Sequence, residues 1–233
     1  MIEPVQNFVR FDIGKNSMGK TPTQIFDLAA YQKIYPNKKY IVAEGQDKFY
    51  DAHKRGQFRI DHLIPKNNPD WATELQEYVE PTPGNKIYKW KDSVLIIDDI
   101  TLFVGLHTRK DFLGLFALRP SPKFNMQMVF NCHEPRNIPE GIKGYITHFH
   151  IYANEASASQ YEDKISCHLQ CQRASLIINK YQSLYPGYYD KSTHTPYFPH
   201  IIVTKENPGK PECVNMDYVK AKPIFDEFTK QAA

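Results

Sequence analysis

The chain has 233 residues, 41% of them hydrophobic and 24% charged, so it can bury a full core and is most simply one domain with an appendage. Its net charge of +3 permits nucleic-acid binding without arguing for it, because the lysines form no long run. No apolar stretch approaches a membrane span of about eighteen residues, and the N-terminus lacks a signal-peptide pattern. The four cysteines do not make a disulfide framework. We therefore expect a soluble intracellular protein with reduced thiols.

A strand expected over residues 7–13 runs directly into a glycine-rich loop. The next eight residues match the phosphate-binding pattern G-x-x-x-x-G-K-T: Gly14, Lys15, Asn16, Ser17, Met18, Gly19, Lys20 and Thr21. The glycines leave room for backbone N–H groups to wrap a polyphosphate, Lys20 can reach the β- and γ-phosphates, and Thr21 can offer its hydroxyl to Mg²⁺. All eight residues are therefore predicted to bind a nucleotide, which we expect to be ATP.

A helix is predicted over residues 21–34, because Ile25, Leu28 and Ala29 recur on one face. Pro22 is compatible with the start of this helix. Proline has no backbone N–H, and an N–H in the first helical turn would have no intrahelical acceptor. The helix N-terminus would add its partial positive charge to the phosphate site.

A second strand is predicted over residues 39–44 and a third over residues 94–98. The third is an apolar run that ends in Asp98 and Asp99, as in a Walker B strand. Asp98 is predicted to hold Mg²⁺, while Asp99 stands where many such ATPases carry a glutamate that polarises the attacking water. Because aspartate is one methylene shorter, Glu44 is the alternative for that task.

The remaining segments also alternate between strand and helix. Residues 46–92 are expected to form helical pieces and loops, with a possible short strand at 86–90. Further elements are predicted along the chain: strands at 125–131, 144–152 and 200–204, and one helix at 157–184. This alternation predicts an α/β fold with a mostly parallel central sheet flanked by helices.

The chain is predicted to divide into an ATPase domain over residues 1–190 and a C-terminal part over 191–233. The C-terminal part is rich in proline, and we expect an arm or hairpin that packs on the domain or on a neighbouring subunit.

A zinc site built from two histidines and two cysteines is an alternative use of the middle of the chain. His148 and His150 alternate on a predicted strand, and Cys167 and Cys171 share a helix face. The spacing matches no common zinc pattern, so a half-exposed histidine pair is the favoured interpretation.

The order of phosphate loop, Walker B strand and a strand ending in residues 129–139 resembles the FtsK-HerA superfamily of DNA-pumping ATPases. The resemblance covers roughly residues 8–155. Two branches fit a chain of this length: genome-packaging ATPases of tailless, membrane-containing icosahedral viruses, and zonular-occludens-toxin-like assembly proteins of filamentous phages. The resemblance implies a RecA-like P-loop fold and Mg²⁺-dependent ATP hydrolysis.

The family also implies a polar sensor and an arginine finger. Where it usually has glutamine, this sequence offers Asn131, whose amide can both donate and accept, with His133 as the second choice. Arg119 stands just before the sensor strand and could reach a neighbouring subunit's nucleotide; the alternative is an ordinary surface arginine at a helix end. Arg136 is a weaker candidate for the finger.

An arginine finger in trans requires a ring, so the resemblance implies a homohexamer that grips double-stranded DNA through its phosphates. The basic residues His107, Arg109 and Lys110 could face its pore, or form a solvated helix start. The expected function is packaging of a viral double-stranded DNA genome into a preformed capsid. The expected partners are capsid-vertex or viral membrane proteins, in the host cytoplasm or at the packaging vertex of the virion.

Three other functions stay open. A toxin-like assembly ATPase usually carries a membrane helix, which this sequence does not show. A P-loop switch such as a helicase loader would need no arginine finger. A small-molecule kinase would be expected to show an arginine-rich lid, whereas residues 100–150 contain three arginines.

Overall fold

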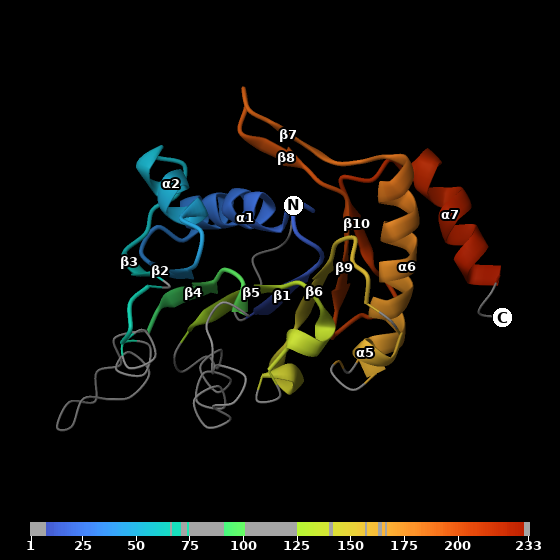
Figure 1. Ribbon diagram of the computed structural model, residues 1–233, viewed down its shortest axis with the longest axis horizontal. Coiled ribbons are helices and arrows are strands. Elements are labelled where there is room, and N and C mark those ends of the chain that lie inside the picture. Colours follow the sequence, from blue (N-terminus) through green and yellow to red (C-terminus); the bar gives the residue numbers. More distant parts are fainter. Residues whose placement is uncertain are drawn as a thin grey trace.

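The computed structural model describes residues 8–65, 67–70, 74, 91–100, 125–139, 142–156, 158–162, 165 and 167–230. These residues form an eight-stranded sheet in the order β10-β9-β6-β1-β5-β4-β2-β3 (Figure 1). Its strands are β1 (Val9–Ile13), β2 (Lys39–Glu44), β3 (His62–Pro65), β4 (Ser93–Ile97), β5 (Gln127–Cys132), β6 (His148–Ile151), β9 (His200–Thr204) and β10 (Glu212–Val214).

The six strands from β6 to β3 run parallel to one another, whereas β9 pairs antiparallel with β6 and β10 antiparallel with β9. Strand β5 lies between β1 and β4, and the register pairs Ile13 with Cys132 and Ile97 with Phe130. The carboxyl ends of β1, β5 and β4 therefore meet at one edge of the sheet, where ligands bind in open α/β folds.

Helices cover both faces of the sheet, as Figure 1 shows. On one face lie α1 (Lys20–Ile34) and α2 (Lys48–Lys54), which pack against Tyr40 and Val42 of β2. The other face buries Ile41 and Ala43 in a cluster that includes residues of α5 (Ala158–Glu162), α6 (His168–Leu184) and α7 (Tyr218–Lys230). Alternate residues of one strand thus enter two separate cores.

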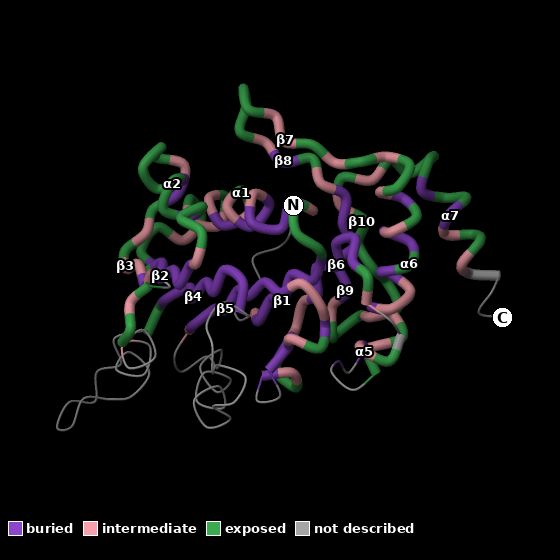
Figure 2. Tube along the Cα trace, in the orientation of Figure 1, coloured by how far each residue is buried: buried purple, intermediate pink, exposed green. Residues whose placement is uncertain are grey.

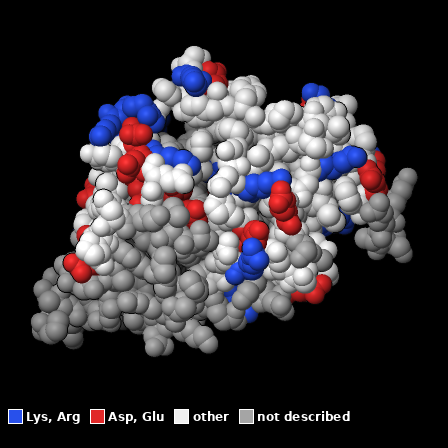
Figure 3. All heavy atoms as spheres, in the orientation of Figure 1, with Lys and Arg blue, Asp and Glu red and all other residues white. Residues whose placement is uncertain are grey.

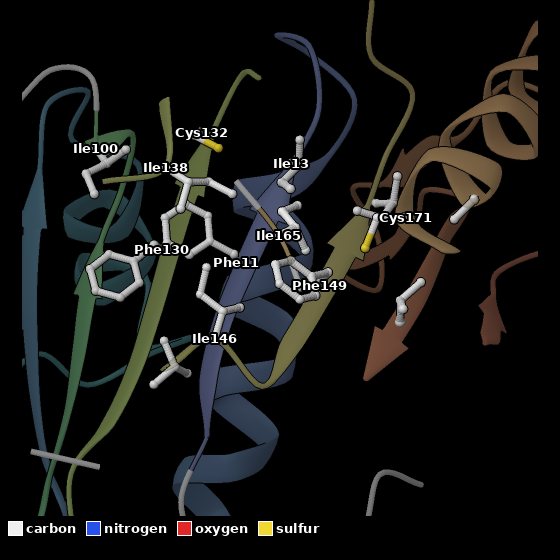
Figure 4. Packing of buried hydrophobic residues seen from close by; sticks show 14 of the residues in the cluster. Phe11, Ile13, Ile100, Phe130, Cys132, Ile138, Ile146, Phe149, Ile165 and Cys171 are labelled. Carbon is white, nitrogen blue, oxygen red and sulfur yellow. The ribbon is translucent and has the colours of Figure 1, made fainter. Parts of the chain in front are cut away.

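The central strands are buried on both faces (Figure 2), which explains the apolar run at residues 94–97 of β4. Figure 4 shows the larger core, in which the rings of Phe11 and Phe130 stack with centroids 5.1 Å apart. Strand β1 also buries two charges, because the guanidinium of Arg10 pairs with Asp12 and with Asp27 of α1 at 2.6 Å each. A buried arginine with two carboxylate partners meets the requirement that buried charges be paired.

The expected parallel α/β fold is confirmed, and its strands lie close to their predicted ranges. Three local predictions need correction. Strands β3 and β10 were not predicted, and the strand expected over 144–152 forms only at His148–Ile151, because the short helix η3 (Lys143–Tyr145) occupies its start. The helix expected over 157–184 is divided into α5 and α6, since Cys167 has a non-helical backbone (φ −110°, ψ 42°). The possible strand at 86–90 lies outside the described residues.

Residues 188–197 form a hairpin of β7 (Tyr188–Asp190) and β8 (Thr195–Tyr197), which projects over α1 apart from the main sheet (Figure 1). Beyond it, β9 and β10 complete the main sheet, so residues 200–204 and 212–214 contribute to the core architecture. The division into residues 1–190 and 191–233 as separate parts stays a prediction. Within the ranges given above, no helix is long and apolar enough to cross a membrane.

Candidate nucleotide-binding site

The glycine-rich loop joins β1 to α1 at the ligand-binding edge of the sheet. Gly19 has φ 83° and forms the N-cap of α1, a left-handed conformation that favours glycine. Gly14 lies close to Tyr152, because a Cβ added at Gly14 would be 2.6 Å from the Cβ of Tyr152. The N–H groups of Gly14 and Lys15 donate to the carbonyls of Cys132 and Ala153 at 3.2 and 2.9 Å, so these two amides hold the loop in place.

The side chain of Lys20 folds back over the loop. Its ammonium donates to the carbonyl of Gly14 and, at 2.9 Å, to that of Lys15. Burial lowers the pKa of Lys20, and the negative charges of nearby groups, among them Asp98 and Asp99, oppose this effect. Carbonyl dipoles hold the cation where a polyphosphate could replace them, which suits a lysine that binds phosphates.

Thr21 and Asp98 bring the loop and the acidic strand together. The hydroxyl of Thr21 donates to Asp98 Oδ1 at 3.0 Å. Burial raises the pKa of Asp98, and the hydrogen bonds from Asn131 and Thr21 act in the opposite direction. A hydroxyl and a carboxylate at this separation are the hard oxygen ligands that Mg²⁺ takes, so the residues present fit that ion.

Asn131 connects the two acidic residues. Its Oδ1 accepts the backbone N–H of Asp99 at 2.5 Å, and its Nδ2 donates to Asp98 and, more weakly, to Gln24 at 3.4 Å. Asp99 has φ 59°, and its carboxylate lies 3.0 Å from His133 Nε2. Both sensor candidates from the sequence therefore touch the acidic pair.

Glu44 lies at the end of β2, but its carboxylate is occupied by α2. Its two oxygens accept the backbone N–H groups of Phe49 and Tyr50 at 2.8 and 2.9 Å. Asp47, the N-cap residue, makes no side-chain capping bond, so Glu44 performs that role from the adjacent strand. Burial raises the pKa of Glu44, and these two hydrogen bonds oppose the rise.

Of the basic residues considered for an arginine finger or for a DNA-binding pore, the structure describes Arg136. Arg119, His107, Arg109 and Lys110 lie outside the described residues. Arg136 belongs to the short helix η2 (Pro135–Asn137), and its exposed guanidinium pairs with Glu134 at 2.5 Å.

The residues gathered around the loop line a cleft of about 370 Å³. Three of them carried no sequence signal: Gln46, Lys48 and Phe198. Lys48 opens α2, and its positive charge lowers the pKa of Asp98, against the larger effect of burial. Neither Lys48 nor Phe198 belongs to a recognisable motif, so only the folded arrangement identifies them.

A second hollow of about 580 Å³ adjoins the cleft between α1, α2 and the β7–β8 hairpin, and it shares Thr21, Pro22 and Lys48 with the cleft. Figure 3 shows Lys and Arg side chains gathered over α2 beside this hollow. Lys33, Lys48 and Arg55 line it, with Asp51 as the acidic lining residue.

The residues weighed for a zinc site form no such cluster. His148 and His150 lie on β6, whereas Cys167 and Cys171 lie at the start of α6 with their sulfurs 3.7 Å apart. Among the described residues, no group of three or more His, Cys, Asp or Glu side chains could hold a metal ion.

No protein-family model matches the sequence, and no curated protein matches it. Solved structures do match. The genome packaging NTPase B204 of Sulfolobus turreted icosahedral virus 2, in complex with ATP-gammaS, has a TM-score of 0.51 at 8% identity, over 90% of this chain and 97% of that one. EccC (ATPases 2 and 3) of Thermomonospora curvata, in complex with a signal sequence peptide, has a TM-score of 0.54 at 12% identity, over 95% of this chain and 41% of that one.

EssC (ATPases 2 and 3) of Geobacillus thermodenitrificans is similar to the same extent, with a TM-score of 0.53 at 10% identity, over 97% of this chain and 44% of that one. At such low sequence identity, these structural matches establish the fold alone. The chain therefore has the α/β fold of the packaging NTPase B204, of EccC and of EssC, which confirms the predicted fold class.

Proposed function

We propose that this chain binds ATP with Mg²⁺ and hydrolyses it to move double-stranded DNA. The observation that supports this best is the hydrogen bond between Thr21 and Asp98, which joins the phosphate loop to the acidic strand in the cleft that also holds Lys20. Phosphoryl transfer depends mainly on positioning and charge stabilisation, and these residues are suited to both.

Each residue has a role in this proposal. Lys20 binds the β- and γ-phosphates, and the free N–H groups at the start of α1 hold the remaining oxygens. Thr21 and Asp98 hold Mg²⁺, which neutralises phosphate charge when bound. Asp99 orients the attacking water and accepts its proton, while His133 fixes the Asp99 carboxylate.

Asn131 acts as the sensor. In the arrangement described here its amide bridges Asp99 and Asp98. A γ-phosphate that took one of these hydrogen bonds would release one acidic residue from Asn131. The state of the nucleotide would thereby be coupled to the geometry of the acidic pair.

The motor function is the finer part of the proposal. The support for the motor function is the structural similarity to B204, a genome packaging NTPase. The match covers 97% of the B204 chain. We propose that the chain acts as a homohexameric ring that packages a viral double-stranded DNA genome, with Arg119 completing the neighbouring active site in trans. Its docking partners would be capsid-vertex or viral membrane proteins, in the host cytoplasm or at the packaging vertex.

The test is steady-state ATP hydrolysis with and without double-stranded DNA, with the mass of the assembly measured by size exclusion on the same samples. Lys20→Ala removes the phosphate-binding cation. Lys222→Ala is the matched control, because Lys222 is exposed on α7 and pairs with Asp226 at 2.6 Å.

We expect DNA to stimulate hydrolysis by a ring-sized species, Lys20→Ala to abolish the activity, and Lys222→Ala to retain it. Hydrolysis by a monomer that does not respond to DNA would contradict the motor and favour a switch such as a helicase loader. Membrane-dependent stimulation without a response to DNA would favour a toxin-like assembly ATPase.

A further inference from the structure

Phe198 lies in the segment between β8 and β9, far along the chain from the phosphate loop, yet its ring packs directly on that loop. A Cβ placed on Gly19 would lie 2.0 Å from Cγ of Phe198. The absence of a side chain at Gly19 therefore creates the space that the ring occupies. Phe198 also lines the cleft with Lys20, Asp98 and Asp99.

The backbone at Phe198 is held from several sides. A Cβ on Gly187 would lie 2.7 Å from the Cα of Phe198, so the two segments cross in close contact. The carbonyl of Phe198 accepts a hydrogen bond from Asn215 Nδ2 at 3.3 Å and lies 3.1 Å from Nδ1 of His200. These contacts fix the backbone at Phe198 without a partner molecule, as a preorganised binding surface requires.

The ring is only partly covered, because Phe198 is neither fully buried nor fully exposed. One side rests on the loop and the remainder borders the cleft. If the phosphates of a nucleotide lay on the loop, its sugar and base would lie further along the cleft that Phe198 lines. An aromatic ring at that wall offers a stacking surface for the base.

We propose that Phe198 stacks on the base of the bound nucleoside triphosphate, so that the β8–β9 segment completes a site whose phosphate part comes from the loop. This inference rests on the proposed nucleotide binding and adds a residue to it. Stacking contributes affinity with little regard to base identity, because every base presents a π-face. The subsite therefore favours a nucleoside triphosphate over a bare polyphosphate.

The experiment compares ATP with inorganic tripolyphosphate, which carries the phosphates without the nucleoside. Dissociation constants for both are measured by calorimetry with the unaltered protein, Phe198→Leu and Phe198→Trp. Leucine keeps an apolar side chain against Gly19 but has no aromatic π-face, whereas tryptophan keeps an aromatic π-face at this position. Tyr218→Ala is the matched control, because Tyr218 is an aromatic residue 76% exposed on α7.

We expect Phe198→Leu to weaken ATP binding by about 5-fold or more and to leave tripolyphosphate binding unchanged. Phe198→Trp should restore ATP binding, and Tyr218→Ala should change neither constant. Equal weakening of both ligands would overturn the inference, because the ring would then only brace the loop. Unchanged or tighter ATP binding by Phe198→Leu would overturn it as well.

The proposed function can fail separately. If the unaltered protein binds tripolyphosphate but not ATP, the base subsite is wrong while the phosphate site stands. If it binds neither, the nucleotide-binding function itself is wrong, and the inference is wrong with it.

Discussion

The hydroxyl of Thr21 donates a 3.0 Å hydrogen bond to the carboxylate of Asp98, 77 positions further along the chain. The contact exists because β5 lies between β1 and β4, so that the start of α1 faces the end of β4 across one strand. The carboxylate oxygen that accepts this bond also accepts one from Asn131. Two neutral donors thus hold the carboxylate of a buried acid in one orientation.

The Thr21 and Asp98 pair predicts a metal dependence. Thr21→Ala and Asp98→Asn should each raise the Mg²⁺ concentration that gives half-maximal ATP hydrolysis by about 10-fold or more, because each removes an oxygen ligand or its charge. A Mg²⁺ titration of the hydrolysis rate measures this. Thr21→Ser keeps the hydroxyl and should behave as the unaltered protein; a normal Mg²⁺ dependence in Thr21→Ala would contradict the assignment.

The two candidates for water activation should separate into a catalytic and a structural residue. Asp99→Asn should lower the hydrolysis rate by about 100-fold or more with little change in stability, since it removes a general base. Glu44→Gln should lower the free energy of unfolding by about 1 kcal/mol or more, because it weakens the cap of α2, while the rate per folded molecule stays within about 3-fold.

Urea unfolding and single-turnover hydrolysis on the same preparations distinguish these outcomes. A large loss of rate in Glu44→Gln, with normal activity in Asp99→Asn, would reverse the two roles. The structure favours the first assignment, because both oxygens of Glu44 already accept hydrogen bonds from the backbone of α2.

The parts of the site that could be predicted from the sequence are those set by local pattern. The loop from Gly14 to Thr21 has fixed spacing, and Asp98 ends an apolar run, so the parallel sheet brings them to one edge. The capping role of Glu44 was not predictable, since it depends on where α2 begins. Phe198 was missed for a similar reason: its contact with Gly19 arises only when the β8–β9 segment folds back onto the loop.

The same distinction applies to the fold. Strand β4 is buried along its whole length, and such strands have apolar runs that a sequence reveals. The spacing of apolar residues does not reveal the break between α5 and α6, because Ile165 and Leu169 keep helical spacing across the non-helical Cys167. Periodic spacing of apolar residues does not report whether the backbone is continuous, and it does not place every such residue in the core, since Leu169 is 62% exposed.

Pro22 predicts an unusual weakness in phosphate binding. Gly19 is the N-cap of α1, so Pro22 is the third residue of the helix and one of the four first-turn N–H donors is missing. Pro22→Ala restores that donor and should tighten ATP and tripolyphosphate binding by about 3-fold to 10-fold, since hydrogen bonds to charged groups are stronger than neutral ones. Calorimetry with both ligands measures the change, and equal or weaker binding would show that this amide does not face the phosphates.

His200 predicts a loss of stability in mild acid. Burial lowers its pKa to about 4, the hydrogen bond with the carbonyl of Phe198 opposes the decrease, and the charge of Arg10 adds to it. The ring is 1% exposed and stacks on Tyr152 with centroids 4.6 Å apart, so the folded state holds it neutral. In the unfolded chain histidine titrates near pH 6.5, and protons therefore bind the unfolded state first as the pH falls.

The stabilisation linked to His200 is complete above about pH 6.5 and is lost as the pH falls toward 4. Between pH 7.5 and pH 5.0 the unaltered protein should lose about 2 kcal/mol more unfolding free energy than His200→Gln, which cannot take up this proton. Urea unfolding at the two pH values measures the difference. Burial raises the pKa of Asp98 and of Glu44, so these two residues make the unfolding free energy change with pH in the opposite direction. Both residues are present in the unaltered protein and in His200→Gln, so their contributions cancel in the difference between the two proteins. Identical pH dependence in the two proteins would show that His200 is protonated in the folded state.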